Sequence, residues 1–130
     1  IMALGKIKAD TLEHSTAGSL DTSYVVSAVP KAFVNFNAES SNAIRISMNL
    51  SSLTDIAAGQ HALNYSSAMS SGNLFALASV GDTGSTTGQR VAGIGDAFVP
   101  TTTQSRFDAI SNGNLDDQDH HSYGIIGDLA

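Results

Sequence analysis

Two neighbouring segments of the chain alternate with a period of two residues, and this pattern constrains the fold more than any other feature. Residues 31–37 read KAFVNFN, and every second residue from Ala32 lies on the same side of an extended strand. Residues 43–50 read AIRISMNL and place an apolar residue at every second position from Ile44. The connection at 38–42, AESSN, is typical of a turn, so the two segments are predicted to form a β-hairpin.

Short strand-like segments continue to the end of the chain, separated by stretches rich in glycine and serine. They recur at intervals of roughly 8–12 residues, which is typical of all-β domains. The further expected strands are residues 61–65, 74–80, 90–99, 105–110 and 122–129. The run at 74–80, LFALASV, is almost continuously apolar and is predicted to be a buried strand. The fold predicted is all-β, a compact antiparallel β-sandwich or a jelly-roll-like domain.

The N-terminal part of the chain has a different character. Residues 10–23, DTLEHSTAGSLDTS, are polar and rich in turn-forming residues, with too little apolar periodicity for a long helix. Residues 1–23 are therefore predicted to form an extended arm, and residues 24–130 the β-sandwich domain. Within that domain, the polar segments 81–89 and 111–121 are expected to be exposed loops.

The charge balance argues against several classes of partner. The chain has 130 residues, with 12 acidic and 6 basic side chains and a net charge of −6. Nucleic acids and anionic membranes bind clustered lysine and arginine, so neither is an expected partner. The apolar runs fall far short of the ~20 residues that span a bilayer, so membrane insertion is not expected. Only 14% of the residues are charged, which favours a chain that covers much of its surface with neighbouring subunits.

Four motifs in a fixed order relate the first part of the chain to a known family. They are KADT at 8–11, KAFVNFN at 31–37, NLSSLTD at 49–55 and LNYSSAM at 63–69. Over residues 5–80 the chain resembles a tail-fibre-like family of phage virion proteins found in phages of marine bacteria. Phe33 stands where that family usually has tryptophan, and the turn at 38–42 lacks the usual glycines.

The resemblance implies a non-enzymatic structural protein located in the virion. It implies partners among other virion proteins, a homotrimer, and an arm that docks on the virion or on a neighbouring subunit. A tail-fibre-like role includes receptor binding, with a host-surface glycan as the ligand. The alternative is a capsid-decorating protein, which the shortness of the chain favours because a fibre needs a shaft. A third interpretation is that the chain is a carbohydrate-binding module unconnected with virions.

The strand residues expected away from the core suggest a subunit interface. The predicted interface residues are Phe33, Asn35, Arg45 and Asn49, which the alternation places opposite the apolar sides of the two strands. An aromatic, weakly charged surface is typical of interface cores. The alternative is that Phe33 packs under a loop of its own chain.

Candidate ligand-binding residues lie in the loops and beside them. Tyr65 and Tyr123 could stack on a sugar ring, with Asn114 and Asp116 as exposed polar neighbours, although a core or interface role is the alternative for both tyrosines. No cofactor is expected, and no catalytic residue is assigned, because the sequence lacks a Gly-x-Ser-x-Gly nucleophile motif. GIGDAF at 93–98 also lacks the third glycine of a dinucleotide-binding motif.

The polar segment before the last strand contains candidate metal ligands. Asp116 and Asp119 offer the oxygen ligands that calcium prefers, and His120 and His121 are possible transition-metal ligands. Adjacent residues of a strand point to opposite faces, so both histidines would not bind one ion within one chain. One of them, repeated about a threefold axis, could do so. The alternative is a solvated loop, and no metal is assigned.

Overall fold

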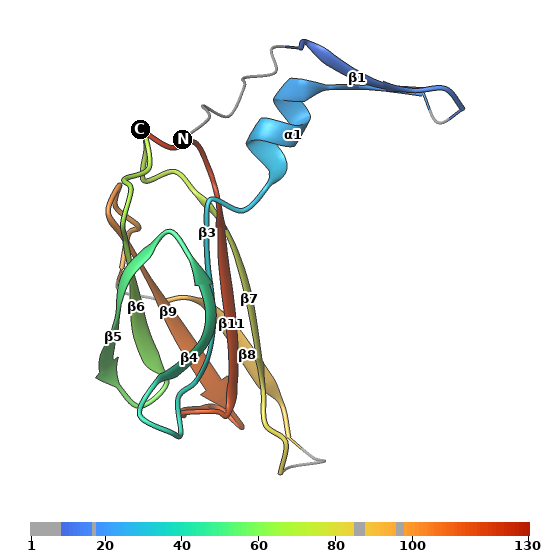
Figure 1. Cartoon of the computed structure of the whole chain (residues 1–130). Coiled ribbons are helices and arrows are strands. Elements are labelled where there is room, and N and C mark those ends of the chain that lie inside the picture. Colours follow the sequence, from blue (N-terminus) through green and yellow to red (C-terminus); the bar gives the residue numbers. More distant parts are fainter. Residues whose placement is uncertain (1–8, 17, 85–87, 96–97) are drawn as a thin grey trace, which may run out of the picture.

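The computed structural model describes residues 9–16, 18–84, 88–95 and 98–130, and nearly all regular structure in them is β (Figure 1). The strands of the main body are β3 (Ala32–Asn37), β4 (Ala43–Met48), β5 (Leu50–Ala57), β6 (Gln60–Tyr65), β7 (Phe75–Gly81), β8 (Arg90–Ile94), β9 (Gln104–Ser111), β10 (Asn114–Leu115) and β11 (His120–Ile126). They form two sheets that pack against each other, which confirms the predicted all-β sandwich.

One sheet has four strands in the order β4-β3-β11-β7, and the other has five, in the order β10-β9-β6-β5 with β8 also paired to β9. All pairs are antiparallel. The predicted hairpin is present, because β3 pairs with β4, with Phe33 opposite Met48. The first and last strands of the sandwich, β3 and β11, lie side by side in the centre of the four-stranded sheet.

The chain changes sheets between β4 and β5. Asn49 separates the two strands and has a left-handed backbone with φ of 52°. Such a conformation ends the extended strand, and asparagine tolerates it better than most residues. The expected single strand over 43–50 is therefore two strands, with Leu50 belonging to the five-stranded sheet.

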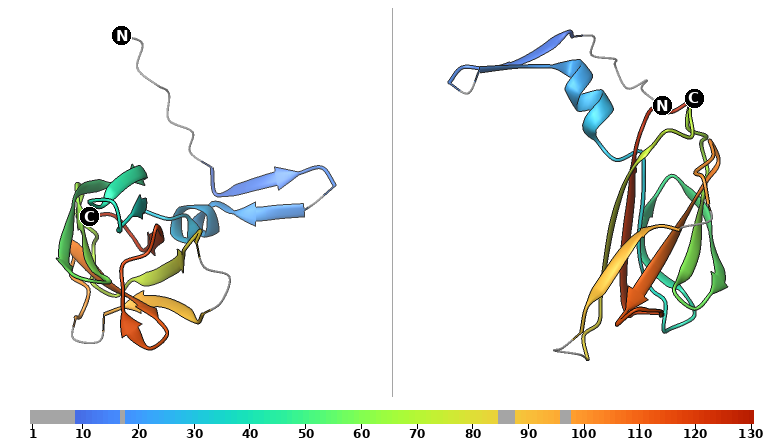
Figure 2. Two further views of the ribbon diagram at one scale, coloured as in Figure 1. Left: turned by 90° about the horizontal axis from the view of Figure 1, so that it is seen from below. Right: turned by 180° about the vertical axis from the view of Figure 1, so that it is seen from behind.

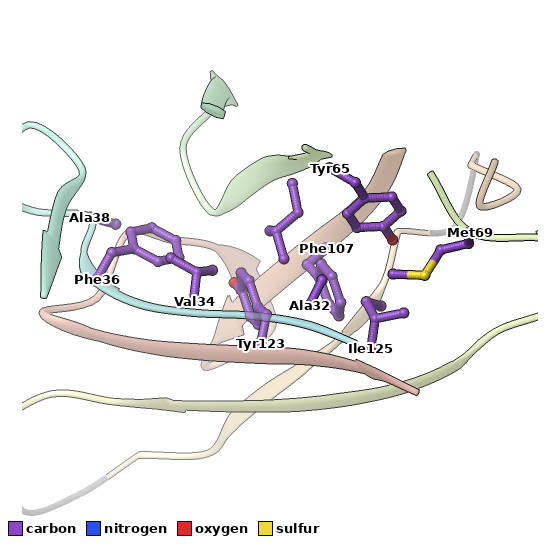
Figure 3. Packing of buried hydrophobic residues seen from close by; sticks show 10 residues of the cluster. Ala32, Val34, Phe36, Ala38, Tyr65, Met69, Phe107, Tyr123 and Ile125 are labelled. Carbon is purple, nitrogen blue, oxygen red and sulfur yellow. The ribbon is translucent and has the colours of Figure 1, made fainter. Parts of the chain in front are cut away.

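The core lies between the two sheets and is rich in aromatic residues (Figure 3). Its buried hydrophobic members are Ala32, Val34, Phe36, Ala38, Leu63, Tyr65, Met69, Phe107, Tyr123 and Ile125. β3 alternates between buried and half-buried residues, as the sequence pattern predicts. The rings of Phe107 and Tyr123, one from each sheet, stack with their centroids 4.2 Å apart. Such contacts join the sheets through apolar burial.

Two strands expected to bury their apolar residues expose them instead. In β4, Ile46 lies opposite Asn35 of β3 and is 59% exposed. In β7, Phe75 and Leu77 are 63% and 47% exposed. Both strands are edges of the four-stranded sheet. In β7 every second residue is half-buried towards the core, whereas in β4 all six residues are exposed. The prediction of a fully buried strand at 74–80 is therefore wrong.

The arm is a small folded unit that projects from one end of the sandwich (Figures 1 and 2). It consists of the hairpin β1 (Thr11–His14) and β2 (Gly18–Asp21), followed by helix α1 (Thr22–Ala28). Asp21 caps the helix, because its carboxylate accepts a hydrogen bond from Ser23 N at 2.8 Å. The predicted boundary between residues 23 and 24 falls inside α1. Residues 1–8 of the predicted arm lie outside the described residues.

Candidate functional site

The side of the four-stranded sheet that faces away from the core, here called the outer face, is apolar. It is formed by Phe33, Asn35, Ile46, Met48, Phe75, Leu77, Ser79, Ser122 and Gly124. The described strands β3, β4, β7 and β11 contain no aspartate or glutamate, although the chain has 12 acidic residues. An exposed apolar surface without acidic groups is typical of a site that contacts another macromolecule.

A trough runs along the centre of the outer face, where β11 contributes Gly124 between Phe33 of β3 and Leu77 of β7. Its volume is about 480 Å³. The φ angle of Gly124 is not positive, so the backbone does not require glycine there. A Cβ atom at this position would meet Leu77 Cβ at 3.8 Å, which is an ordinary contact. The missing side chain therefore serves to leave the trough open.

Much of the corresponding side of the five-stranded sheet is polar, and there its side chains bind one another. Asn64 Nδ2 donates to Ser52 Oγ at 2.9 Å and to Thr54 Oγ1 at 3.0 Å. Gln104 Nε2 donates to Asn64 Oδ1 at 2.6 Å. Gln60 Nε2 donates to Asp108 Oδ1 at 3.1 Å. Val91, Ile110 and Leu115 form a smaller apolar part of this side, next to β8 and β10. Exposed large apolar side chains are more numerous on the outer face of the four-stranded sheet, which is therefore better suited to a partner.

The arm and its junction with the sandwich add further exposed apolar surface. Leu12 and Leu20, paired across the hairpin, are 50% and 47% exposed, and Tyr24 of α1 is 65% exposed. None of the residues of α1 is buried. A cleft of about 810 Å³ lies between α1 and the β4–β5 corner and is lined in part by Val26 and Met48. Met48 also belongs to the outer face, so the two apolar surfaces are continuous.

Two of the predicted interface residues lie at the outer face, and Arg45 occupies an irregular position beside it. Asn35 Nδ2 donates to Ser122 Oγ at 2.7 Å, across the strands of the outer face. A register shift between Asn35 and Phe36 leaves Arg45 without a residue directly opposite, and its guanidinium donates to Phe36 O at 3.2 Å. Regular alternation does not hold in β4, because the register places Met48 opposite Phe33, but the guanidinium of Arg45 still reaches Asn35 Oδ1 on the outer face, at 3.5 Å.

The fourth predicted interface residue, Asn49, stabilises the corner between the sheets. Its Oδ1 accepts a hydrogen bond from Ser67 N at 2.6 Å, and its Nδ2 donates to Ser67 O at 3.0 Å. Ser66 N donates to Asn49 O at 3.3 Å. The side-chain amide is thus bound within the chain, which gives Asn49 a structural role.

We expect Asn49→Ala to lower the free energy of unfolding by about 2 kcal/mol. The change removes two exposed hydrogen bonds, each worth about 0.5 kcal/mol, and places alanine in the left-handed conformation, which costs about 1 kcal/mol more. Urea titration followed by circular dichroism measures the effect. Asn49→Gly is the matched control, because it keeps the backbone conformation and loses the amide; a loss as large as that of alanine would show that backbone strain is unimportant.

Both tyrosines predicted to stack on a sugar are buried. Tyr65 is 7% exposed and Tyr123 2% exposed. Their hydroxyl groups lie 2.5 Å from Ser105 Oγ and from His121 Nδ1, respectively. They belong to the core, so the prediction that they bind ligand at the surface is wrong, and the alternative of a core role is the one the structure supports.

The two polar loops meet at the end of the sandwich remote from the arm (Figure 1). Thr83 N donates to Asp119 Oδ1 at 3.1 Å, and Arg90 Nε donates to Gln118 Oε1 at 2.6 Å. The loop candidates Asn114 and Asp116 are both exposed. Residues 85–87 of the loop predicted at 81–89 lie outside the described residues.

The candidate metal ligands are not brought together in the structure. Asp119 accepts hydrogen bonds from Thr83 and lies 3.1 Å from Nδ1 of the half-exposed His120. Hydrogen bonding to Thr83 is the main reason that the pKa of Asp119 is lowered. His121 points into the core, and Asp116 accepts a hydrogen bond from Gln118 at 2.8 Å. Within the described ranges no group of three or more histidine, aspartate or glutamate side chains forms a possible metal site.

A pair of buried histidines is the feature that sequence reasoning missed. His61 of β6 and His121 of β11 are both fully buried, with ring centroids 5.1 Å apart. Gln118 N donates to His121 Nε2 at 3.0 Å, so Nε2 carries no proton and Nδ1–H donates to the Tyr123 hydroxyl. Among the residues described, neither ring nitrogen of His61 has a hydrogen-bond partner. In the sequence, His61, Leu63 and Tyr65 stand at every second position, and this spacing indicated that they share one side of the strand.

Comparisons with known protein families, with curated proteins and with solved structures find no match. In the part of the chain that the structure describes, no helix is long and apolar enough to cross a membrane. The fold and its surfaces define a β-sandwich with one apolar outer face and a projecting arm.

Proposed function

We propose that the chain is a non-enzymatic structural protein of a phage virion. The observation that carries the proposal is the apolar outer face, whose strands have no acidic residue in a chain with net charge −6. Such a surface is unfavourable in water and is stabilised when another subunit covers it. The projecting arm, with its exposed Leu12, Leu20 and Tyr24, is a second surface that needs a neighbour. Together with the four motifs, they support a role in assembly.

A tail-fibre-like position with receptor binding is the form of the role that the loops favour. The described parts of the two polar loops lie at the end away from the arm, so an arm attached to the particle would direct these loops outwards (Figure 1). Asn114 and Asp116 are exposed there and offer hydrogen-bonding groups to a host-surface glycan. Loops on a rigid β-scaffold are common binding surfaces.

Decoration of the capsid is the second candidate, and the position of the outer face favours it. This face runs along the side of the sandwich, between the edge strands β4 and β7, and not across its end. Subunits that form a layer on a capsid surface contact one another along their sides.

Labelled antibody fragments and electron microscopy of intact particles test the proposal. We expect label on the virion, at the tail for a fibre-like protein or over the head for a decorating protein. Particles without the protein should adsorb poorly in the first case and have fragile heads in the second. Absence of label from every particle would contradict the virion role in both forms.

A further inference from the structure

The outer face and the arm are two uncovered apolar surfaces of one chain. The outer face exposes Ile46, Phe75 and Leu77 to 59%, 63% and 47%, and in the arm Tyr24 is 65% exposed. The arm extends sideways from the end of the sandwich and does not cover the outer face of its own chain (Figures 1 and 2). A hairpin with four-residue strands and a seven-residue helix are only marginally stable without packing. In the part of the chain that the structure describes, neither surface is covered, so each of them is available to a partner.

The outer face and the described part of the arm differ in charge. The hairpin and helix of the arm, residues 9–28, contain Asp10, Glu13 and Asp21 and no lysine or arginine, and the lysines of the N-terminal segment, Lys6 and Lys8, precede them. The strands of the outer face contain no acidic residue, and β4 contributes the exposed cation of Arg45. Copies that each carry a net charge of −6 repel one another, so they can associate best where acidic groups are absent from one side of the contact.

Gly124 points to a close approach from outside the chain. Neither its backbone conformation nor its neighbours require glycine, yet a strand interior is weakened by one. In such a position glycine often marks a site where a ligand or another backbone comes close. The trough above it, about 480 Å³ between Phe33 and Leu77, is lined mainly by apolar groups and matches an apolar side chain in character.

We propose that the outer face binds the arm of a second copy of this chain, with Tyr24 and the apolar hairpin residues seated over Gly124. A contact between two different surfaces satisfies both at once, whereas packing two outer faces together would leave the arms uncovered. Such head-to-tail contacts form a closed ring or an open filament. A ring of three would be the expected homotrimer. The inference deepens the proposed function by naming the partner of the outer face, but it concerns the purified protein without any virion.

The test is self-association of the full chain, measured by analytical ultracentrifugation over a range of concentrations. Gly124→Lys places a charge in the trough and is expected to weaken association at least about 100-fold, because an unpaired charge would be buried. Leu77→Lys, at an exposed position on the same face, should do the same without touching the core. Gly93→Lys is the matched control: Gly93 lies on the outward side of the five-stranded sheet, and a Cβ there meets nothing within 4 Å. It should associate like the unmodified chain.

The arm is tested by Tyr24→Glu, which removes the exposed ring but keeps the helix, since glutamate is favourable in the first turn. This variant should also fail to associate. A mixture of Tyr24→Glu and Gly124→Lys should form a one-to-one heterodimer, because one variant keeps an intact face and the other an intact arm. A chain that stays monomeric at all concentrations, or a mixture that forms no heterodimer, would overturn the inference. Neither result bears on whether the protein lies on virions, which the labelling experiment tests separately.

Discussion

The free energy of unfolding is expected to fall by about 3 kcal/mol when the pH is lowered from 7 to 4, because of buried histidine. Burial, and to a smaller extent the charge of His61, lower the pKa of His121 from 6.5 to about 4. Burial also lowers the pKa of His61, although Asp117 and Asp55 partly oppose this effect. The unfolded chain therefore binds more protons than the folded chain in this range. Stability is complete above pH 6.5 and is lost as the pH falls towards 4.

Urea unfolding at several pH values, at a concentration where the chain is monomeric, measures this loss. His121→Gln is the matched variant, because its amide can still accept the hydrogen bond from Gln118 N but does not titrate. Its stability should depend much less on pH between 6.5 and 4. The pKa of Asp119 is lowered, so the stability that this carboxylate contributes is lost mainly below its ordinary value of 3.8. An unchanged pH dependence in His121→Gln would show that another group is responsible.

The fold was predictable because strands leave a simple signal. The alternation in KAFVNFN placed Val34 and Phe36 on the core side, and the structure confirms this arrangement. The sheet to which each strand belongs was not predictable, since it depends on the left-handed backbone at Asn49, which carries the chain from one sheet to the other. Alternation every second residue shows that a strand has two different sides, but it does not show which of them faces the core. For β4 the apolar side at Ile46 faces outwards.

Part of the candidate site was also predictable from the alternation of strand residues. Phe33 and Asn35 were expected away from the core, and both lie on the outer face. The apolar contributions of β4 and β7 were missed, because exposed apolar strands look like buried ones in sequence. Tyr123 was misplaced because it follows a polar segment, whereas β11 begins at His120 and places it at the centre of the core. Its partner His121 was interpreted as a candidate metal ligand because it also follows the polar segment.

Phe36→Ala is expected to cost about 4 kcal/mol of stability, because it removes the ring on which the aromatic core centres. Phe36 is fully buried, and its ring centroid lies 4.9 Å from that of His61 and 4.8 Å from that of His121. The cavity left behind would be enclosed by strands of both sheets and could not close without moving them. Thermal and urea unfolding measure the loss, which is large relative to the total stability of a domain of this size.

Phe33→Ala is the matched control on the same strand, three residues away and on the outer face. In the monomer it should cost less than about 1 kcal/mol, because the ring is partly exposed and lines the trough. It should weaken self-association at least tenfold, since the ring would form one wall of the arm-binding site. Phe36→Ala, where it remains folded, should leave association nearly unchanged. A loss of stability in Phe33→Ala as large as that in Phe36→Ala, with association unaffected, would mean that Phe33 serves its own fold and not an interface.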